Sequence, residues 1–269
     1  GPGTGTSMTN IAHESLGIPV NQIRFELGDS SLPTAGSQGG STTTSTVGSA
    51  VFDACAAVKE NLLPLLQKTD GFKDATLADL VFSESAVMKK SGGPRILLRD
   101  LLKQNNLPNI EATRESRGNP EAQKYSMYSF SIHFAEVRVH PSTGVVRVKR
   151  VVTVADSGKI VSPKTAASQM IGGVTGGIGM ALTEEAVIDH RYGRFVNNNF
   201  ADYHVPVSAD VPHIDTIFID KPDPVINPMG SKGMGEIALI GFAAAIANAV
   251  YHATGKRVRD LPITPDKLI

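Results

Sequence analysis

The 269-residue chain is poor in cysteine, in net charge and in long apolar runs. Its single cysteine, Cys55, excludes an internal disulfide and a zinc or iron–sulfur centre held by cysteines of this chain alone. The 26 basic and 26 acidic residues cancel, and no block of one sign stands out, so neither a nucleic-acid footprint nor a basic membrane face is predicted. No apolar run reaches the roughly 18 residues expected of a membrane span, and the start lacks a signal-peptide pattern. Cys55 lies among alanines and is predicted to be a small buried helical residue.

The chain also lacks an initiating methionine. It opens at Gly1, already inside a glycine-rich segment, which indicates a fragment or processed half of a longer protein. The pair Gly1-Pro2 also fits the remnant of a cleaved tag, and Gly3 would then be the first native residue.

Hydrophobic periodicity divides the chain into helices and strands. Helices are predicted at residues 7–16, 47–67, 163–187 and 237–254, and strands at 23–27, 127–139, 145–155 and 214–219. Neighbouring strands with long helices between them predict an α+β fold, with small mixed sheets packed against long buried helices. Two α+β subdomains are expected, at residues 1–125 and 126–269.

The most informative stretch is residues 230–236, a glycine-rich loop that brings Glu236 to the start of the last helix. From Ile237 to Thr254 almost every residue is apolar or small, and a helix that is apolar all round is predicted to be buried. Glu236 would then be a carboxylate in a partly dry place, which suits a general base. On the local pattern alone, a first-turn glutamate that complements the helix dipole is an equal alternative.

Small residues gather in three stretches, 1–6, 36–46 and 230–235, each just before or within a helix. Their backbone N–H groups can approach a ligand, and a helix start favours an anion, so three such loops favour a phosphate-bearing ligand over coincidence. No dinucleotide fingerprint or phosphate-loop pattern fits. The seven histidines show no metal-ligand spacing, and His133 in a predicted strand indicates packing rather than a ligand. Ser41 has no histidine and carboxylate placed to activate it as a nucleophile.

The predicted helix at 163–187 is unusually rich in glycine. Each glycine costs a helix about 1 kcal/mol relative to alanine. That cost is tolerated where another backbone or a ligand must approach closely. The glycines are Gly172, Gly173, Gly176, Gly177 and Gly179.

Taken together, the loops resemble the xanthine dehydrogenase/aldehyde oxidase family, in the C-terminal part of its molybdopterin-binding subunit. The resemblance runs nearly end to end, and it rests on the order and spacing of motifs that are each loose alone. They are GTGT at 3–6, IAHESLGIP at 11–19, LGD at 27–29, GGS at 39–41, GSAV at 48–51, FAEV at 134–137, Gln169 with GG at 172–173 and GIG at 177–179, GMGE at 233–236, AAIANAV at 244–250 and DLPITP at 260–265.

The resemblance implies a molybdenum cofactor, either molybdopterin or its cytosine dinucleotide form, whose metal is held by the pterin dithiolene rather than by side chains. Subdomain 1–125 would carry two pterin-binding loops, and subdomain 126–269 the glycine-rich helix and the glutamate loop. Glu236 occupies the family's catalytic position. The implied cofactor-binding residues are Gly3, Gly39, Gly40, Ser41, Thr43, Thr44, Gln169 and Gly235.

The implied reaction is hydroxylation of an aldehyde or an N-heterocycle with water as the oxygen source. Glu236 would take the proton of a Mo–OH group as its oxygen attacks carbon, a hydride would pass to the Mo=S sulfur, and electrons would leave through iron–sulfur and FAD groups on partner subunits or domains. A non-catalytic cofactor-binding or assembly module of the same fold is the alternative. A nucleotide-binding transferase is a third hypothesis.

The chain departs from the family pattern in two ways. Pro2 stands where many relatives carry a glutamine near the metal, and the substrate-positioning arginine and aromatic residues lie mainly upstream of the part present here. The implied partners are therefore the upstream half of the molybdenum subunit, iron–sulfur and flavin subunits, and a small-molecule substrate, and the isolated fragment is expected to be inactive. Substrate, pterin form, electron acceptor, oligomeric state and compartment, cytoplasm or periplasm, are left open.

Overall fold

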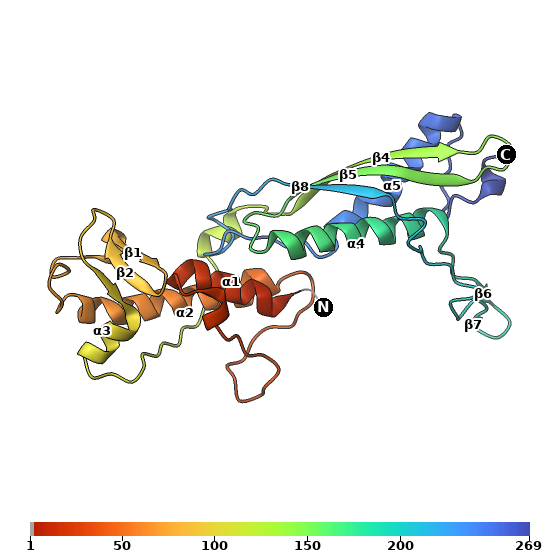
Figure 1. Ribbon diagram of the computed structural model, residues 1–269. Coiled ribbons are helices and arrows are strands. Elements are labelled where there is room, and N and C mark those ends of the chain that lie inside the picture. Colours follow the sequence, from red (N-terminus) through yellow and green to blue (C-terminus); the bar gives the residue numbers. More distant parts are fainter. Residues whose placement is uncertain (1–2) are drawn as a thin grey trace. The chain divides into compact units, whose positions relative to one another are not determined.

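A computed structural model describes residues 3–269, so the expectations for Gly1 and Pro2 lie outside the described residues. The described chain forms two compact units of helices and small sheets, which confirms the α+β fold (Figure 1). The first unit is the chain up to Met127 together with Pro222–Lys232, and the second is Tyr128–Lys221 with Gly233–Ile269. The prediction divided the chain once, after residue 125. In the structure, Pro222–Lys232 packs with the first unit although it lies far along the chain.

The first unit is built on a close pair of helices, α1 (Thr4–Leu16) and α2 (Thr43–Leu66). They approach closely because Gly48 has no side chain: a Cβ there would lie 2.9 Å from Ile11 Cδ1. Both helices begin earlier than predicted. Cys55 is buried in α2, as expected. The prediction of a strand at residues 23–27 is wrong, because this alternating segment pairs with no other strand among the described residues. A short 3₁₀ turn, η1 (Val20–Gln22), comes directly before it.

Beyond α2, the first unit has a three-stranded antiparallel sheet of β1 (Leu80–Ser83), β2 (Ala86–Lys89) and β3 (Arg95–Leu97). The helix α3 (Leu98–Gln104) and the turns η2 (Leu77–Asp79) and η3 (Pro120–Lys124) complete it. A core of fully buried side chains joins the end of α2 to this sheet. It includes Leu62, Leu66, Phe72, Val87 and Leu101.

The second unit centres on a three-stranded sheet in the order β4-β5-β8. The strand β4 (Phe130–Val139) pairs antiparallel with β5 (Val146–Asp156), and β5 pairs parallel with β8 (His213–Phe218). All three strands were predicted within a few residues. A helix, α4 (Pro163–Leu182), follows β5, and α5 (Ile237–Thr254) follows β8 (Figure 1). The helix α4 ends five residues before the predicted 187, because the N–H groups of Thr183 and Glu184 both donate to the carbonyl of Gly179.

The glycines of α4 explain how it packs against α5. A Cβ on Gly173 would lie 2.9 Å from the backbone nitrogen of Leu239, and a Cβ on Gly177 would lie 2.8 Å from Phe242 Cβ. Gly172, in contrast, faces open space. The glycines are therefore used for close backbone approach, and the two helices and the sheet share a core that includes Val151, Ala155, Met170, Val174, Phe242 and Ile246.

The expectation that α5 is buried all round is wrong. Phe242 and Ile246 are completely buried, but Ile240 on the opposite side is 82% exposed. By length and composition α5 is also long and apolar enough to cross a membrane, contrary to the expectation that no segment of the chain is. A single such helix is weak evidence, because core helices pass the same test, and α5 packs one side against α4 and β4.

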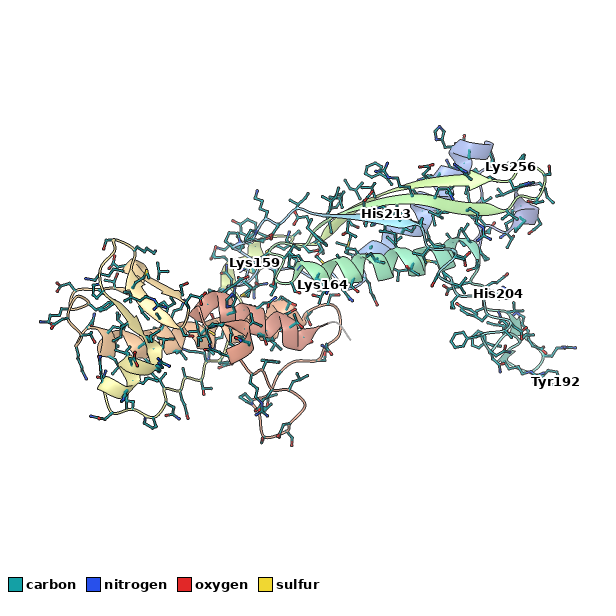
Figure 2. All side chains as sticks on the ribbon, viewed as in Figure 1. Lys159, Lys164, Tyr192, His204, His213 and Lys256 are labelled. Atoms are coloured by element: carbon teal, nitrogen blue, oxygen red, sulfur yellow. The ribbon has the colours of Figure 1, made fainter. Side chains whose placement is uncertain are left out.

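Peripheral segments complete the second unit. A small hairpin of β6 (Ile188–Asp189) and β7 (Arg194–Phe195) follows α4, with Tyr192 in the turn between its strands (Figure 2). His213 opens β8, and the chain ends in a short 3₁₀ turn, η4 (Pro265–Lys267).

Candidate cofactor site

Two of the predicted cofactor loops meet in the first unit. Gly3 is the N-cap of α1 with φ 82°, and the second loop turns into α2 through Gly40 and Ser41, with φ 62° and 58°. The amide Nε2 of Gln38 donates a hydrogen bond to the hydroxyl of Thr4, which joins the loops. Left-handed backbone at these positions exposes N–H groups, and no side chain caps either helix.

The hydroxyls at the start of α2 fall into two groups. Thr42 donates to the carbonyl of Gly39 at 2.9 Å, and Ser45 and Thr46 donate back to the carbonyl of Thr42. Within residues 3–269, the side chains of Ser41, Thr43 and Thr44 make no hydrogen bond. These three predicted binding residues thus combine free hydroxyls with an uncapped helix start, a donor set that fits a phosphate group.

Glu236 is the N-cap residue of α5, with φ −117° and ψ 11°. Its carboxylate has no hydrogen bond or ion pair in the part of the chain that the structure describes. The expected partly dry position is wrong for this chain, since Glu236 is exposed. The reason is its place on the helix: Ile240, four residues on and therefore on the same side, is also exposed, while burial begins with Ala238 and Phe242.

Gln169 lies on α4, one turn before the position at which this helix contacts α5. Gly173 lies against Ala238, and Gly177, four residues later, lies against Phe242, also four residues later. The two helices α4 and α5 therefore run in the same direction. Gln169 lies one turn before Gly173 on α4, and the half-buried Gly235 lies just before the start of α5. The side chain of Gln169 is half-buried and makes no hydrogen bond to the described residues. The second unit therefore contains all three predicted residues, Gln169 on α4 and Gly235 and Glu236 at the start of α5.

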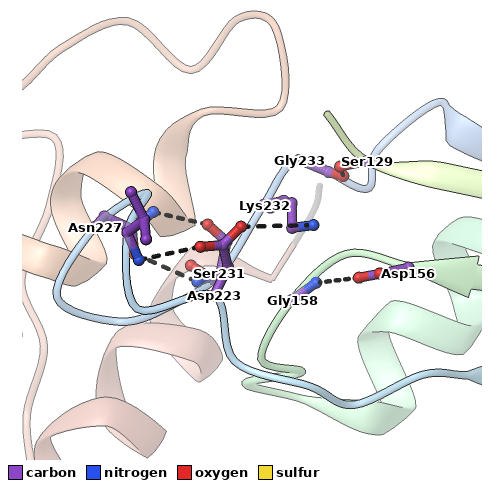
Figure 3. Close-up of polar contacts among 9 residues, drawn as sticks. Ser129, Asp156, Gly158, Asp223, Asn227, Ser231, Lys232 and Gly233 are labelled. Atoms are coloured by element: carbon purple, nitrogen blue, oxygen red, sulfur yellow. Dashed lines mark hydrogen bonds and ion pairs between the residues drawn. The ribbon is translucent and has the colours of Figure 1, made fainter. Parts of the chain in front are cut away.

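The loop that leads to Glu236 begins in the first unit as a folded turn (Figure 3). The amide of Asn227 donates to the carbonyl of Ser231 at 2.7 Å, and its carbonyl oxygen accepts from the Ser231 N–H at 3.3 Å. Lys232 pairs with Asp223 at 3.8 Å. Gly230 is required here, because its φ is 66° and a Cβ would lie 2.9 Å from the nitrogen of Asp223. The glycine-rich loop is thus ordered by its own hydrogen bonds.

Sequence reasoning predicted the strand β4 but missed that the serines at its start support the glutamate segment. The hydroxyl of Ser129 donates to the carbonyl of Gly233 (Figure 3), and the hydroxyl of Ser131 donates to the carbonyl of Ile237 at 3.1 Å. The signal was available: Ser129, Ser131 and His133 alternate with apolar residues, so they share one face of a strand. Read singly, His133 was assigned to packing.

That packing role of His133 is confirmed. Its ring meets Phe242 edge-on, with centroids 5.9 Å apart, and its Nδ1 lies 2.8 Å from the hydroxyl of Thr153. Burial lowers the pKa of His133 below its ordinary value, against the smaller effect of a hydrogen bond to the carbonyl of Ile237. The imidazole is therefore held in its neutral form.

No group of three or more His, Cys, Asp or Glu side chains that could hold a metal ion is present among residues 3–269. The candidate ligands are instead hydroxyls, an amide and backbone N–H groups, which suit an anionic organic cofactor.

Comparison with known proteins agrees with this donor set. The sequence pattern of the molybdopterin cofactor-binding domain matches residues 1–212. The chain is 40% identical over 272 residues to the aldehyde oxidoreductase molybdenum-binding subunit PaoC of Escherichia coli K12, covering 100% of this chain and 35% of that protein. It is 28% identical over 281 residues to the putative xanthine dehydrogenase molybdenum-binding subunit XdhA of the same organism, covering 100% of this chain and 36% of that protein.

The fold is shared with solved structures as well. Quinoline 2-oxidoreductase from Pseudomonas putida 86 superimposes with a TM-score of 0.83 at 25% identity, covering 99% of this chain and 34% of that one. The chain thus spans about a third of the length of the curated relatives it matches, 35% in the case of PaoC. On these matches the chain belongs to the molybdopterin cofactor-binding domain family, and its relatives include the molybdenum-binding subunits of an aldehyde oxidoreductase and of a putative xanthine dehydrogenase.

Proposed function

We propose that this chain forms the part of a molybdenum hydroxylase that holds the cofactor and supplies the catalytic base, Glu236. The substrate class is an aldehyde or an N-heterocycle, and the oxygen added to it comes from water. The observation that carries the proposal is the carboxylate of Glu236 at the start of α5, which has no hydrogen bond or ion pair among the described residues. A carboxylate that served only the fold would be expected to bond a helix N–H, and Glu236 bonds none.

The residues of the two units take different roles in this proposal. In the first unit, Ser41, Thr43 and Thr44 bind the phosphate of the cofactor through their hydroxyls and the N–H groups of the uncapped helix start. In the second unit, Gln169 donates a hydrogen bond from its amide to the pterin side. The bound cofactor supplies the Lewis-acidic metal and accepts the electron pair from the substrate.

Glu236 accepts a proton as the water-derived oxygen becomes bonded to the substrate carbon. For an aldehyde, the overall change converts R–CHO and H₂O into R–COOH with the release of two protons and two electrons. One proton is taken by Glu236 and passed to solvent, to which the exposed carboxylate has access. The electrons leave through iron–sulfur centres, and further to a flavin, on partner subunits, and the upstream half of the molybdenum subunit supplies the groups that orient the substrate.

The test replaces Glu236 in the assembled enzyme, with the upstream half and the electron-transfer partners present. In the Glu236→Gln variant we expect kcat to fall by about 10³-fold or more, because proton transfer by a positioned base contributes about 10²–10⁴-fold. Molybdenum and pterin contents should stay equal to those of the wild type. Glu185→Gln is the matched control, since Glu185 is an exposed glutamate after α4. Near-normal turnover in Glu236→Gln would contradict the catalytic role and favour a binding or assembly module.

A further inference from the structure

The inward face of β4 carries polar side chains at the end nearest Glu236. Ser131 and His133 on β4, and Ser129 just before it, alternate with Phe130 and Ile132, which are exposed on the other face. Further along the strand the inward residues are apolar, Ala135 and Val137, and they pack against the common core. Polarity on this face is therefore confined to one end of the strand.

The hydroxyls of Ser129 and Ser131 bind the backbone on both sides of Glu236. Ser129 donates to the carbonyl of Gly233, three residues before it, and Ser131 donates to the carbonyl of Ile237, the next residue, at 3.1 Å. The side chain of Glu236 itself forms no hydrogen bond with residues 3–269, and Glu236 follows two glycines, Gly233 and Gly235. Because glycine permits many backbone conformations, these two contacts decide where the segment lies.

His133 fixes the direction of the Ser131 hydroxyl. The ring nitrogen Nε2 lies 3.0 Å from Ser131 Oγ, and Nδ1 lies 2.8 Å from the hydroxyl of Thr153, which is completely buried on β5. With the Ser131 hydroxyl donating to the carbonyl of Ile237, the tautomer that carries its hydrogen on Nε2 donates to Ser131 Oγ and accepts from Thr153 at Nδ1. The hydrogen bonds form one directed chain from Thr153 through His133 and Ser131 to Ile237.

The last helix leaves room for this arrangement at Gly241. A Cβ at that position would lie 2.9 Å from Cδ2 and 3.3 Å from Nε2 of His133. The ring therefore occupies the space that a side chain on the second turn of α5 would take. The imidazole therefore packs directly between β4 and the start of α5.

We propose that Ser129, Ser131 and His133 are positioning residues for Glu236, which they hold by fixing the backbone before and after it. The inference rests on the proposed role of Glu236 as the base. Packing alone does not call for these residue types, because apolar side chains join the same strand and helix further along. A base must meet its proton within hydrogen-bond reach, and a displacement of about 1 Å can cost about 10²-fold in rate.

The experiment compares Ser131→Ala, Ser131→Thr and Ser129→Ala in the assembled enzyme. Ser131→Ala removes the hydroxyl, and Ser131→Thr keeps it on a residue that strands favour. Ser142→Ala, in the exposed turn between β4 and β5, is the matched control. Two quantities are measured: amide hydrogen exchange of residues 233–241 by mass spectrometry, and kcat and KM at equal molybdenum content.

In Ser131→Ala and Ser129→Ala we expect exchange at residues 233–241 to be faster by about 5-fold, the effect of losing one hydrogen bond. We expect kcat to fall by about 10-fold with KM changed by less than about 2-fold, because the two hydroxyls bond only the backbone on either side of Glu236. Ser131→Thr should restore both quantities, and Ser142→Ala should change neither.

Faster exchange with unchanged kcat would overturn the positioning role and leave the hydroxyls as structural. Unchanged exchange in both alanine variants would overturn it as well. If Ser131→Ala does not assemble, Ser129→Ala decides the outcome alone. Glu236→Gln is measured in parallel: if it keeps turnover, the proposed function fails, whereas its loss together with unaffected serine variants defeats the positioning inference alone.

Discussion

The two units hold their candidate site residues in opposite ways. In the first unit, Ser41 at the end of an exposed loop and Thr43 and Thr44 in the first turn of α2 present hydroxyls that the described chain leaves unbonded. In the second unit, the segment around Glu236 is tied to β4 on both sides. A residue that binds a ligand can be ordered by that ligand, whereas a base must be in place before the reaction begins.

Glycine shows the same contrast. Gly40 turns the first unit's loop through a left-handed conformation, with only a methyl of Thr42, 3.8 Å away, near its missing side chain. Gly173 and Gly177 in the second unit are regular helical residues whose missing side chains let α5 approach. Replacing glycines of the first unit's loop should therefore change cofactor binding, whereas replacing Gly173 or Gly177 should change the free energy of unfolding of the second unit.

The largest effect is expected from replacing the free hydroxyls of the first unit. The double variant Thr43→Val/Thr44→Val should weaken cofactor binding by about 10²-fold or more, since each hydrogen bond to a charged group contributes about 1.5–3 kcal/mol. The free energy of unfolding of the cofactor-free chain should change by less than about 0.5 kcal/mol, because no internal hydrogen bond is lost. Pterin content after purification and chemical denaturation measure the two quantities.

The control for that variant is Thr46→Val, whose hydroxyl donates within the chain to the carbonyl of Thr42 at 3.0 Å. It should leave the pterin content unchanged. Equal loss of pterin in Thr46→Val and in the double variant would show that the hydroxyls of Thr43 and Thr44 have no special role in binding the cofactor.

An intermediate effect is expected at two neighbouring glycines of α4. Gly173→Ala should destabilise the second unit by about 1–3 kcal/mol, because the new methyl group would lie 2.9 Å from the backbone of α5. Gly172→Ala, which meets nothing within 4 Å, should stabilise it by up to about 1 kcal/mol. Thermal and urea unfolding would measure both, and the same sign of change in the two variants would contradict the close approach of α5.

The smallest effect concerns pH and His133. Burial lowers its pKa in the folded state below the unfolded value of 6.5, so between the two values the unfolded chain binds more protons. The contribution of His133 to stability is therefore complete above pH 6.5 and is lost as the pH falls below it. The free energy of unfolding should decline less steeply from pH 7 to 5 in His133→Gln than in the wild type. His190→Gln, in the exposed β6–β7 hairpin, should keep the wild-type slope, and equal slopes in all three proteins would refute the assignment.

Long periodic segments could be predicted from the sequence. The bounds of α5 were found from its composition, and with them the place of Glu236 at its start. What the sequence could not show is which neighbour covers an apolar surface: α5 was expected to be buried, yet Ile240 is exposed. The alternation at residues 23–27 failed for the same reason, because a strand requires a second strand beside it.

The support of Glu236 was beyond local reasoning because it joins residues far apart in the chain. Ser129 and Gly233 are separated by 104 positions, and Ser131 and Ile237 by 106. Local patterns could indicate only that Ser129, Ser131 and His133 share a face. The return of Pro222–Lys232 to the first unit is likewise a long-range contact that periodicity does not report.

Gly241 sets a limit on how stable the last helix can become. Alanine is the best helix former and fills much of α5, including positions 243–245, so alanine at 241 would be the obvious stabilising substitution. Its methyl group would instead collide with the imidazole of His133 at 2.9 Å. The helix propensity that alanine would add at this turn is therefore opposed by displacement of the ring. Gly241→Ala should disturb the contact between His133 and Ser131, so glycine at this position keeps the ring in place at the cost of helix propensity.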